Sequence, residues 1–279
     1  MTFIQGLILG IIQGLTEFLP ISSSAHVQIA SELMQVPGLS EKNSATTAFV
    51  ATIQLGTEAA VLLYFAKDIW RLLTAFFKGI FNSAKRSSAD YRMACYVILG
   101  SIPVAVVGLL FKSFIETTVR NLWVIAVMLI VFGLVLFVAD RIGKKQKPIS
   151  ELTFGSAMLF GIGQMLAVIP GVSRSGASIS FGLFAGFNRA AAARFSFLIG
   201  IPAVLASGLL EFKDNYHNLD SNSMMGTITA TVASFVVGYL VIAGLLKYLN
   251  KGSFVPFVIW RVLVGIGLIV MLSTGMIAA

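Results

Sequence analysis

Two polar stretches interrupt an otherwise apolar chain, and their residue types are those that phosphate chemistry needs. The first is QGLTEFLPISSSAH, Gln13–His26, and the second is VIPGVSRSGASIS, Val168–Ser180. Each combines a proline with several serines. Such residues are rare inside apolar segments unless they have a function. We predict that the two stretches meet inside a membrane and form one site for an anionic substrate.

Gln13 and Glu17 lie four residues apart, so a helix would place them on the same face. Both offer oxygen ligands, which suits a hard cation such as Mg²⁺ or Ca²⁺. The alternative is a polar pair that bonds to a neighbouring helix. His26 lies close in sequence to Ser23 and Glu17. A lone histidine is often only a satisfied buried group, but here we predict an acid–base catalyst.

Ser22, Ser23 and Ser24 follow Pro20 and lead into the next predicted helix. One of them could simply cap that helix. Three in a row beside a histidine favour a phosphate cradle or a nucleophile. Two attacking groups stay open at this point: Ser23 activated by His26, or a water activated by His26 or Glu17.

The second stretch supplies the positive charge. Arg174 offers a planar fork of donors that matches phosphate. Gly171 and Gly176 would let backbone N–H groups approach a ligand, and the hydroxyls of Ser173 and Ser175 add further donors. A helix begins here, so its positive dipole end faces the same point. Two helix N-termini and one arginine then converge, which predicts a phosphate site.

The composition places these stretches in a membrane. The chain has 279 residues, of which 57% are hydrophobic and 11% charged, whereas soluble domains carry roughly 25% charged residues. The net charge of +8 is scattered over predicted loops, so it favours contact with anionic lipid over nucleic acid. A single cysteine excludes an internal disulfide.

Each polar stretch is flanked by two apolar arms that are too short to cross a bilayer of about 30 Å comfortably. The arms Phe3–Leu19 and Ala25–Met34 flank the first polar stretch, and Thr153–Ile169 and Gly176–Phe187 flank the second. We predict that each pair forms a re-entrant hairpin. The sequence further predicts an interfacial amphipathic stretch in a basic loop, 67–92, and six spanning helices: Thr46–Ala66, Met93–Phe111, Leu122–Ala139, Phe195–Leu210, Gly226–Leu246 and Phe254–Leu272.

The expected fold is therefore an all-α integral membrane protein with an internal repeat. One membrane domain would contain repeat one, 1–140, a basic linker, 141–150, and repeat two, 151–279. Each repeat has a hairpin and three spans, so the two must be inverted. Most basic residues fall at 67–92, 140–151, 188–194 and 247–253, which predicts that these loops are cytoplasmic and both termini outside. The hairpin tips would then meet near the midplane.

Two further charged residues have open roles. Glu58 lies four residues after Gln54 on a predicted span, where it could line a cavity or bond to a neighbouring helix. Arg261, within VIWRVLVG, could pair with Glu58 or lie near the cytoplasmic interface.

The motifs resemble those of the undecaprenyl-diphosphate phosphatase family, the bacitracin-resistance membrane phosphatases, over essentially the whole chain. The family's first motif, Glu or Gln, three residues, then Glu, corresponds to Gln13–Glu17 followed by FLPISSSAH. Its second motif, PGxSRSxxT, corresponds to PGVSRSGAS at 170–178. Three positions depart from the pattern: Gln13 replaces a carboxylate, Ala25 a common glycine, and Ser178 a threonine whose hydroxyl it keeps.

The resemblance implies a multi-pass enzyme of the bacterial plasma membrane, with its site open to the outer side. It would hydrolyse undecaprenyl diphosphate to the monophosphate and recycle the lipid carrier of cell-wall synthesis. It would need a divalent cation, held here by Gln13 and Glu17. Glu17, Ser23, His26 and Arg174 match functional positions, and substrate contacts are expected from Ser22, Ser24, Gly171, Ser173, Ser175, Gly176 and Ser178.

Two questions stay open at the level of sequence. A transporter of polyprenyl phosphate would use the same inverted-repeat site, because broken helices at the midplane are typical of transporters. The oligomeric state is also open, and a homodimer is one alternative.

Overall fold

The computed structural model describes residues 1–36, 44–111, 121–215 and 224–277. The regular structure of these residues is helical, apart from one isolated parallel bridge between Lys147 and Phe187. Five described helices are long and apolar enough to cross a membrane, or six if a bent pair counts as one span. The prediction of an all-α, multi-pass membrane protein is therefore confirmed.

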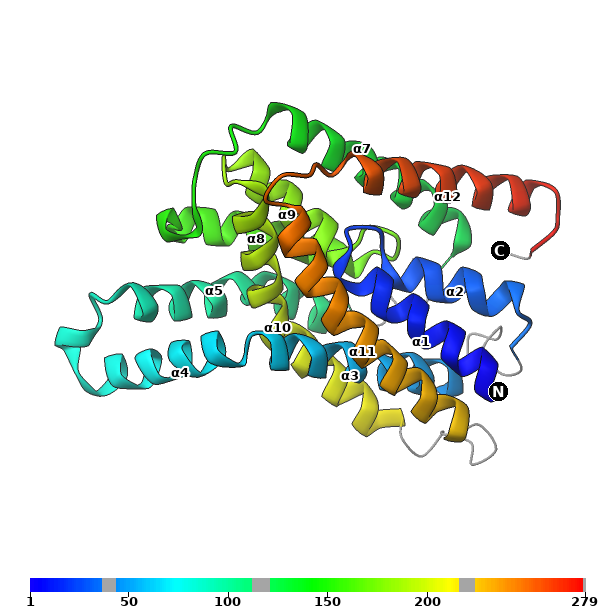
Figure 1. The fold of residues 1–279 in the computed structure, drawn as a ribbon, viewed down its shortest axis with the longest axis horizontal. Helices are drawn as coiled ribbons and strands as arrows, with labels where there is room; N and C mark the ends of the chain where they lie inside the picture. Colours follow the sequence, from blue (N-terminus) through cyan, green and yellow to red (C-terminus); the bar gives the residue numbers. More distant parts are fainter. Residues whose placement is uncertain (37–43, 112–120, 216–223, 278–279) are drawn as a thin grey trace.

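Two hairpins of short helices occupy the predicted positions (Figure 1). The first contains α1 (Phe3–Phe18) and α2 (Ser23–Leu33). The second contains α8 (Phe154–Met165), which continues as the 3₁₀ turn η4 (Leu166–Val168), and α9 (Arg174–Phe184). Both α1 and α8 begin with a reciprocal cap between a threonine and the residue three positions later. Both returning helices begin two residues earlier than predicted.

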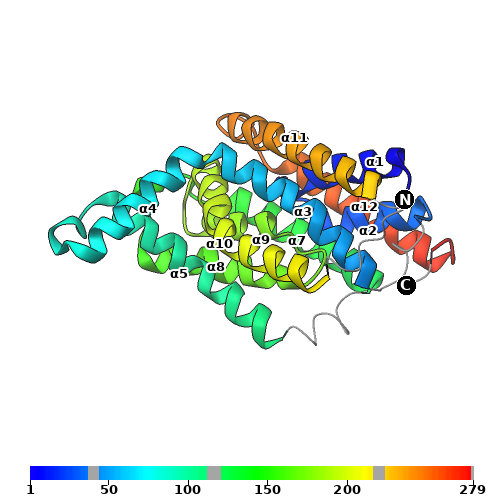
Figure 2. The same ribbon diagram turned by 90° about the horizontal axis from the view of Figure 1, so that it is seen from below.

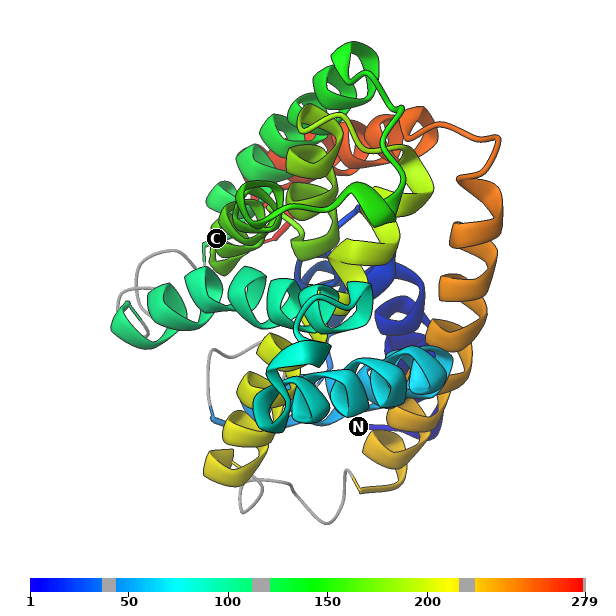
Figure 3. The same cartoon turned by 90° about the vertical axis from the view of Figure 1, so that its left-hand side faces the viewer.

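The long helices surround these hairpins. They are α3 (Ser44–Tyr64), α5 (Ala89–Leu110), α7 (Leu122–Ile142), α10 (Arg189–Asn215), α11 (Met224–Tyr248) and α12 (Val255–Ser273). Figure 2 shows α3 between α11 and α10, and Figure 3 shows α7 and α12 side by side. In Figure 1 the first hairpin opens toward the end where both termini lie, and the second toward the opposite end.

Small residues allow α1 to approach α11 closely. A Cβ atom added at Gly6 or Gly10 would overlap the backbone of Gly226 or Ala230. Such contacts between small residues are typical of helix pairs in membranes. These contacts fix α1 against α11, and they therefore also fix the position of the polar break that follows α1.

Several predicted loop residues are helical. Residues 66–81, which contain the predicted amphipathic stretch, form the helix α4 (Ala66–Phe81), which meets the Phe49–Tyr64 part of α3 at a bend of 73°. Asp68 on α4 forms ion pairs with two arginines: Arg71 on the same helix, at 3.1 Å, and Arg194 near the start of α10. Arg189 binds Asp140 through two hydrogen bonds of 2.6 and 3.1 Å. The residues predicted as a loop at 188–194 instead form the start of the helix α10, which begins at Arg189. The predicted linker, 141–150, begins inside α7, which includes Arg141.

Candidate functional site

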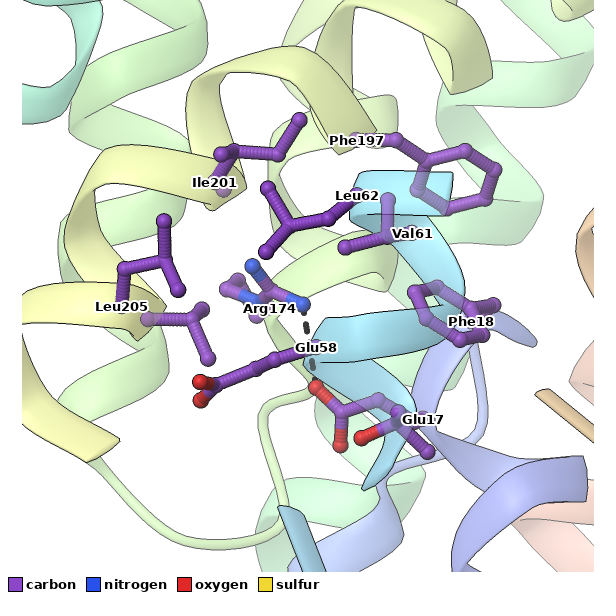
Figure 4. Close-up of a pocket in the computed structure, with 12 residues that line it drawn as sticks. Glu17, Phe18, Glu58, Val61, Leu62, Arg174, Phe197, Ile201 and Leu205 are labelled. Atoms are coloured by element: carbon purple, nitrogen blue, oxygen red, sulfur yellow. Dashed lines mark hydrogen bonds and ion pairs between the residues drawn. The ribbon is translucent and has the colours of Figure 1, made fainter. Parts of the chain in front are cut away.

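The two helix breaks meet at the centre of the molecule, as the sequence predicted. Arg174 Nη2 lies 3.0 Å from Glu17 Oε1, although 157 residues separate them (Figure 4). A second contact joins the breaks, because the Ser175 hydroxyl donates to the carbonyl oxygen of Leu19 at 3.2 Å. The structure thus brings the carboxylate of one hairpin to the arginine of the other.

Glu17 accepts hydrogen bonds from three predicted site residues. Besides Arg174, these are the Ser23 hydroxyl, at 2.5 Å from Oε2, and the Gln13 amide, at 3.1 Å from Oε2. The Glu17 side chain is only 9% exposed and that of Arg174 is 21% exposed. Charges shielded from water interact strongly, so this group of four residues should be well ordered.

The two breaks have the same local geometry. Ser22 precedes α2 with φ of 78°, and Ser173 precedes α9 with φ of 73°. The hydroxyl of each lies 3.3 Å from that of the serine two positions later, Ser24 or Ser175. A positive φ costs a non-glycine residue on the order of 1–3 kcal/mol, and functional sites are where such strain collects. The helices α2 and α9 begin at these breaks, so the positive ends of both helix dipoles lie there.

A cavity of about 640 Å³ adjoins this polar centre. One part is lined by Glu17, Arg174 and the serines 22–24 and 173. The remaining wall is largely apolar and comes from α5, α10 and η4, with Ile102, Val168 and Val204 among its residues. A cavity with one charged end and an apolar wall suits an amphiphile with an anionic head.

His26 does not face Ser23 in this structure. Its Nδ1 lies 2.8 Å from the Ser22 carbonyl oxygen, which can only accept, so Nδ1 carries the proton. Its Nε2 accepts a hydrogen bond of 2.8 Å from the Trp260 indole. The two rings also stack, with centroids 6.1 Å apart. Both ring nitrogens are therefore engaged, and the Ser23 hydroxyl donates to Glu17 instead. The contact that activation of Ser23 by His26 would need, one of the two alternatives from the sequence, is not formed.

Four predicted substrate contacts support the second break instead of lining the cavity. The Gly171 carbonyl accepts from Arg261, and a Cβ at Gly171, where φ is 91°, would overlap the backbone of Ile125. The Gly176 N–H donates to the Ser173 hydroxyl as a cap. Ser178 is fully buried, and its hydroxyl donates to the Arg174 carbonyl and lies 2.5 Å from the Ser196 hydroxyl. Ser175, 3% exposed, likewise bonds to Leu19.

Glu58 and Arg261 have distinct places. Glu58 lines a narrow pocket together with Glu17 and Arg174 (Figure 4) and is not part of the wall of the larger cavity. Both roles considered for it from the sequence stay predictions. Arg261 is fully buried and donates to five backbone carbonyls, a role that was not considered from the sequence. Its position within an apolar segment was a signal of function, but the backbone partners could not be deduced.

Gly200 of α10 makes room for the Arg174 side chain. A Cβ atom there would overlap the Arg174 guanidinium. We expect Gly200→Ala to displace Arg174 from Glu17 and to lower the turnover of substrate by roughly 100-fold, the typical effect of a misplacement of about 1 Å. Steady-state kinetics check this, and Gly267→Ala, at a position with open space, is the control. A variant with wild-type turnover would show that this cradle is unimportant.

The side chains at the polar end of the cavity could take part in binding a divalent cation. Among the described residues, no group of three or more His, Cys, Asp or Glu side chains could hold a metal. Glu17 and the serines nevertheless offer oxygen ligands on one side of the cavity, and Gln13, whose amide nitrogen donates to Glu17, has a further amide oxygen beside them. That chemistry fits Mg²⁺ or Ca²⁺, which accept few protein ligands when phosphate oxygens and water complete the shell.

Comparison with known proteins agrees with the motifs. The family model described as bacitracin resistance protein BacA matches residues 6–267. An undecaprenyl-diphosphatase of a Nocardioides species is 48% identical over 277 residues, which is 99% of both chains. Undecaprenyl-diphosphatase 1 of Corynebacterium jeikeium is 47% identical over 100% of this chain and 98% of its own. An undecaprenyl-diphosphatase of Renibacterium salmoninarum is 49% identical over 100% of this chain and 99% of its own. The chain therefore belongs to the bacitracin resistance protein BacA family.

Proposed function

We propose that this protein is an undecaprenyl-diphosphatase, a hydrolase that splits the phosphoric anhydride of the C55 lipid diphosphate. The products are the lipid monophosphate, which returns to cell-wall synthesis, and inorganic phosphate. The observation that carries the proposal is the contact between Glu17 and Arg174 at the polar part of a largely apolar cavity. The diphosphate would lie against this pair, and the prenyl chain along the apolar wall. The names of the relatives support the same substrate.

Ser23 is the proposed nucleophile, and Glu17 its base. The Ser23 hydroxyl already donates to Glu17, so the proton can pass to that carboxylate as Oγ attacks the terminal phosphorus. The anhydride P–O bond breaks and the lipid monophosphate leaves. A water then attacks the phosphoserine, releases phosphate and restores Ser23. Arg174, the remaining hydroxyls and the two helix N-termini stabilise the charge on the phosphoryl oxygens.

The alternative attacker is a water activated by Glu17, and a trapped intermediate distinguishes the two. Rapid acid quenching of the wild type with a substrate labelled in the terminal phosphate should leave label on the protein. Ser23→Ala should show neither label nor turnover, whereas Ser24→Ala should still become labelled. Turnover in Ser23→Ala without labelled protein would establish direct attack by water.

We further propose that a divalent cation, Mg²⁺ or Ca²⁺, is held by Glu17, Gln13 and the substrate phosphates. Such an ion would neutralise part of the diphosphate charge. Gln13→Glu supplies a second carboxylate, so we expect it to lower the Mg²⁺ concentration needed for half-maximal activity. Gln13→Ala should raise that concentration. Titration of metal-free protein measures both, and identical metal dependence in all three proteins would contradict the assignment.

The topology proposed from the sequence has structural support. Inverted repeats, 1–140 and 151–279, are consistent with the matching geometry of Ser22 and Ser173 and with hairpins that open toward opposite ends (Figure 1). Both termini would lie outside, with the site open to the outer side of the plasma membrane. In a Cys95→Ser background, an impermeant thiol reagent on intact cells should label a cysteine at Met276 and not one at Lys251, both of which are exposed. The reverse pattern would invert the orientation.

A further inference from the structure

Arg261 joins both helix breaks to the same long helix. Its guanidinium donates to the carbonyl oxygens of Pro20 at 3.1 Å, Gly171 at 2.9 Å and Val172 at 3.0 Å. Two further bonds reach the α7 carbonyls of Leu129, at 3.0 Å, and Met128, at 3.2 Å. A charge that is fully buried is tolerated only when its donors are satisfied, and here backbone carbonyls satisfy them.

The carbonyls from the two breaks are ones that regular helix hydrogen bonding does not use. Pro20 follows the end of α1, and Gly171 and Val172 precede the start of α9. One planar group therefore sets the distance between the break that leads to Ser23 and the break that leads to Arg174. The Glu17–Arg174 and Ser175–Leu19 contacts join the same two breaks directly.

Trp260, the preceding residue of α12, acts on the first break through His26. Its indole N–H donates to His26 Nε2, and His26 Nδ1–H donates to the Ser22 carbonyl, both at 2.8 Å. Ser22 is the strained residue, with φ of 78°, that directly precedes Ser23. Trp260 is half exposed, and its neighbours Ile259 and Leu263 are also exposed, so it lies at the outer, apolar surface of the helix and away from the cavity.

Building on the proposed function, we infer that Trp260 and Arg261 are positioning residues for the two catalytic hairpins, and that His26 connects Trp260 to the first. Adjacent residues of α12 hold the carbonyls of Pro20 and Ser22, which lie on either side of Ile21. They fix the backbone that aims the Ser23 hydroxyl at Glu17. His26 works in this arrangement as a neutral imidazole with its proton on Nδ1, and it transfers no proton to or from the substrate.

His26 and Trp260 variants separate positioning from acid–base catalysis. His26→Asn can keep a donor to the Ser22 carbonyl, whereas His26→Ala cannot. We expect the Asn variant to recover most of the turnover that the Ala variant loses. Trp260→Phe keeps the ring but removes its N–H, and it should lower kcat roughly tenfold, as the loss of about one hydrogen bond would. KM and the shape of the pH–rate profile should stay unchanged in both Asn and Phe variants.

The opposite pattern would overturn the inference. If His26→Asn is as inactive as His26→Ala and loses one limb of the pH–rate profile, His26 transfers a proton. If Trp260→Phe turns over at the wild-type rate, its bond to His26 positions nothing. The double variant Trp260→Phe/His26→Asn should be no slower than the worse single variant, because both act through the same carbonyl. Trp123→Phe, another partly exposed tryptophan, is the control for loss of an indole.

Arg261 is tested with two variants because the more severe one risks misfolding. Arg261→Lys keeps the charge but cannot reach five carbonyls, and it should lower kcat about 100-fold with little change in KM. Arg261→Met removes the charge and should also lower the apparent Tm. An Arg261→Lys protein that folds and turns over normally would refute the positioning role. The wild type is assayed first: if it releases no phosphate, the proposed function fails, whereas an active wild type with unaffected variants refutes this inference alone.

Discussion

Arg174→Lys is expected to lower kcat for hydrolysis of the lipid diphosphate by about 10³-fold, the scale on which loss of a preorganised charge donor acts. The guanidinium can bind Glu17 through one nitrogen and a phosphoryl oxygen through another. A lysine presents one compact charge and cannot do both. It would also leave unfilled the space that Gly200 provides for the planar group.

Steady-state kinetics in detergent measure the effect, together with the apparent Tm to show that the variant is folded. Arg71→Lys is the matched control, because the Arg71 side chain is 58% exposed and lies on α4, away from the cavity. It should keep wild-type kinetics. If Arg174→Lys retains more than about a tenth of wild-type kcat, the guanidinium is not needed for charge stabilisation in the transition state.

Glu17→Gln is expected to lower kcat by about 10³-fold or more, because two functions of the carboxylate are lost together. The amide has nearly the same shape, so packing is retained. It can no longer accept a proton from Ser23, and it leaves the partly buried Arg174 without its carboxylate partner. Glu151→Gln, on an exposed 3₁₀ turn, is the control and should be fully active.

The two variants should also interact. Glu17 and Arg174 are in direct contact at 3.0 Å, so their effects on kcat should not add in the double variant. Strict additivity would indicate that each residue acts alone on the substrate. An active Glu17→Gln protein would exclude Glu17 as the base and transfer that role to another group.

The sequence predicted the parts of the fold that depend on hydrophobic length and on chain breakers. Pro20 and the Pro170–Gly171 pair end their arms close to the observed positions, and the two breaks meet as expected. It predicted helix ends less well where charges are paired across helices. Lys67 and Arg71 belong to a predicted loop whose amphipathic stretch is part of the helix α4, and Asp68 on this helix pairs with both Arg71 and Arg194.

The roles of individual side chains were harder to predict, because a motif gives residue types and not directions. Ser178 follows Arg174 by four residues, so its hydroxyl bonds to that carbonyl in the same helix and does not reach the cavity. His26 is close to Ser23 in sequence, but the side chain it binds is that of Trp260, 234 residues away. Arg261 bonds to backbone carbonyls, and no side-chain pattern in the sequence marks such partners.

Some predictions fall outside the described residues. The loop that includes Lys42, and the residues Lys112, Arg120, His217 and Asp220, belong to segments 37–43, 112–120 and 216–223. Their contribution to the charge asymmetry stays a prediction of the sequence, as does the homodimer.

Release of phosphate from undecaprenyl diphosphate in detergent micelles tests most directly whether the two hairpins form a hydrolytic site. Micelles have no second compartment, so transport cannot contribute. The folded wild-type protein with Mg²⁺ should release one phosphate for each lipid monophosphate formed, and Glu17→Gln and Arg174→Lys should release almost none. A folded wild type that releases no phosphate in micelles, but moves lipid phosphate across reconstituted vesicles, would contradict hydrolysis and identify a transporter.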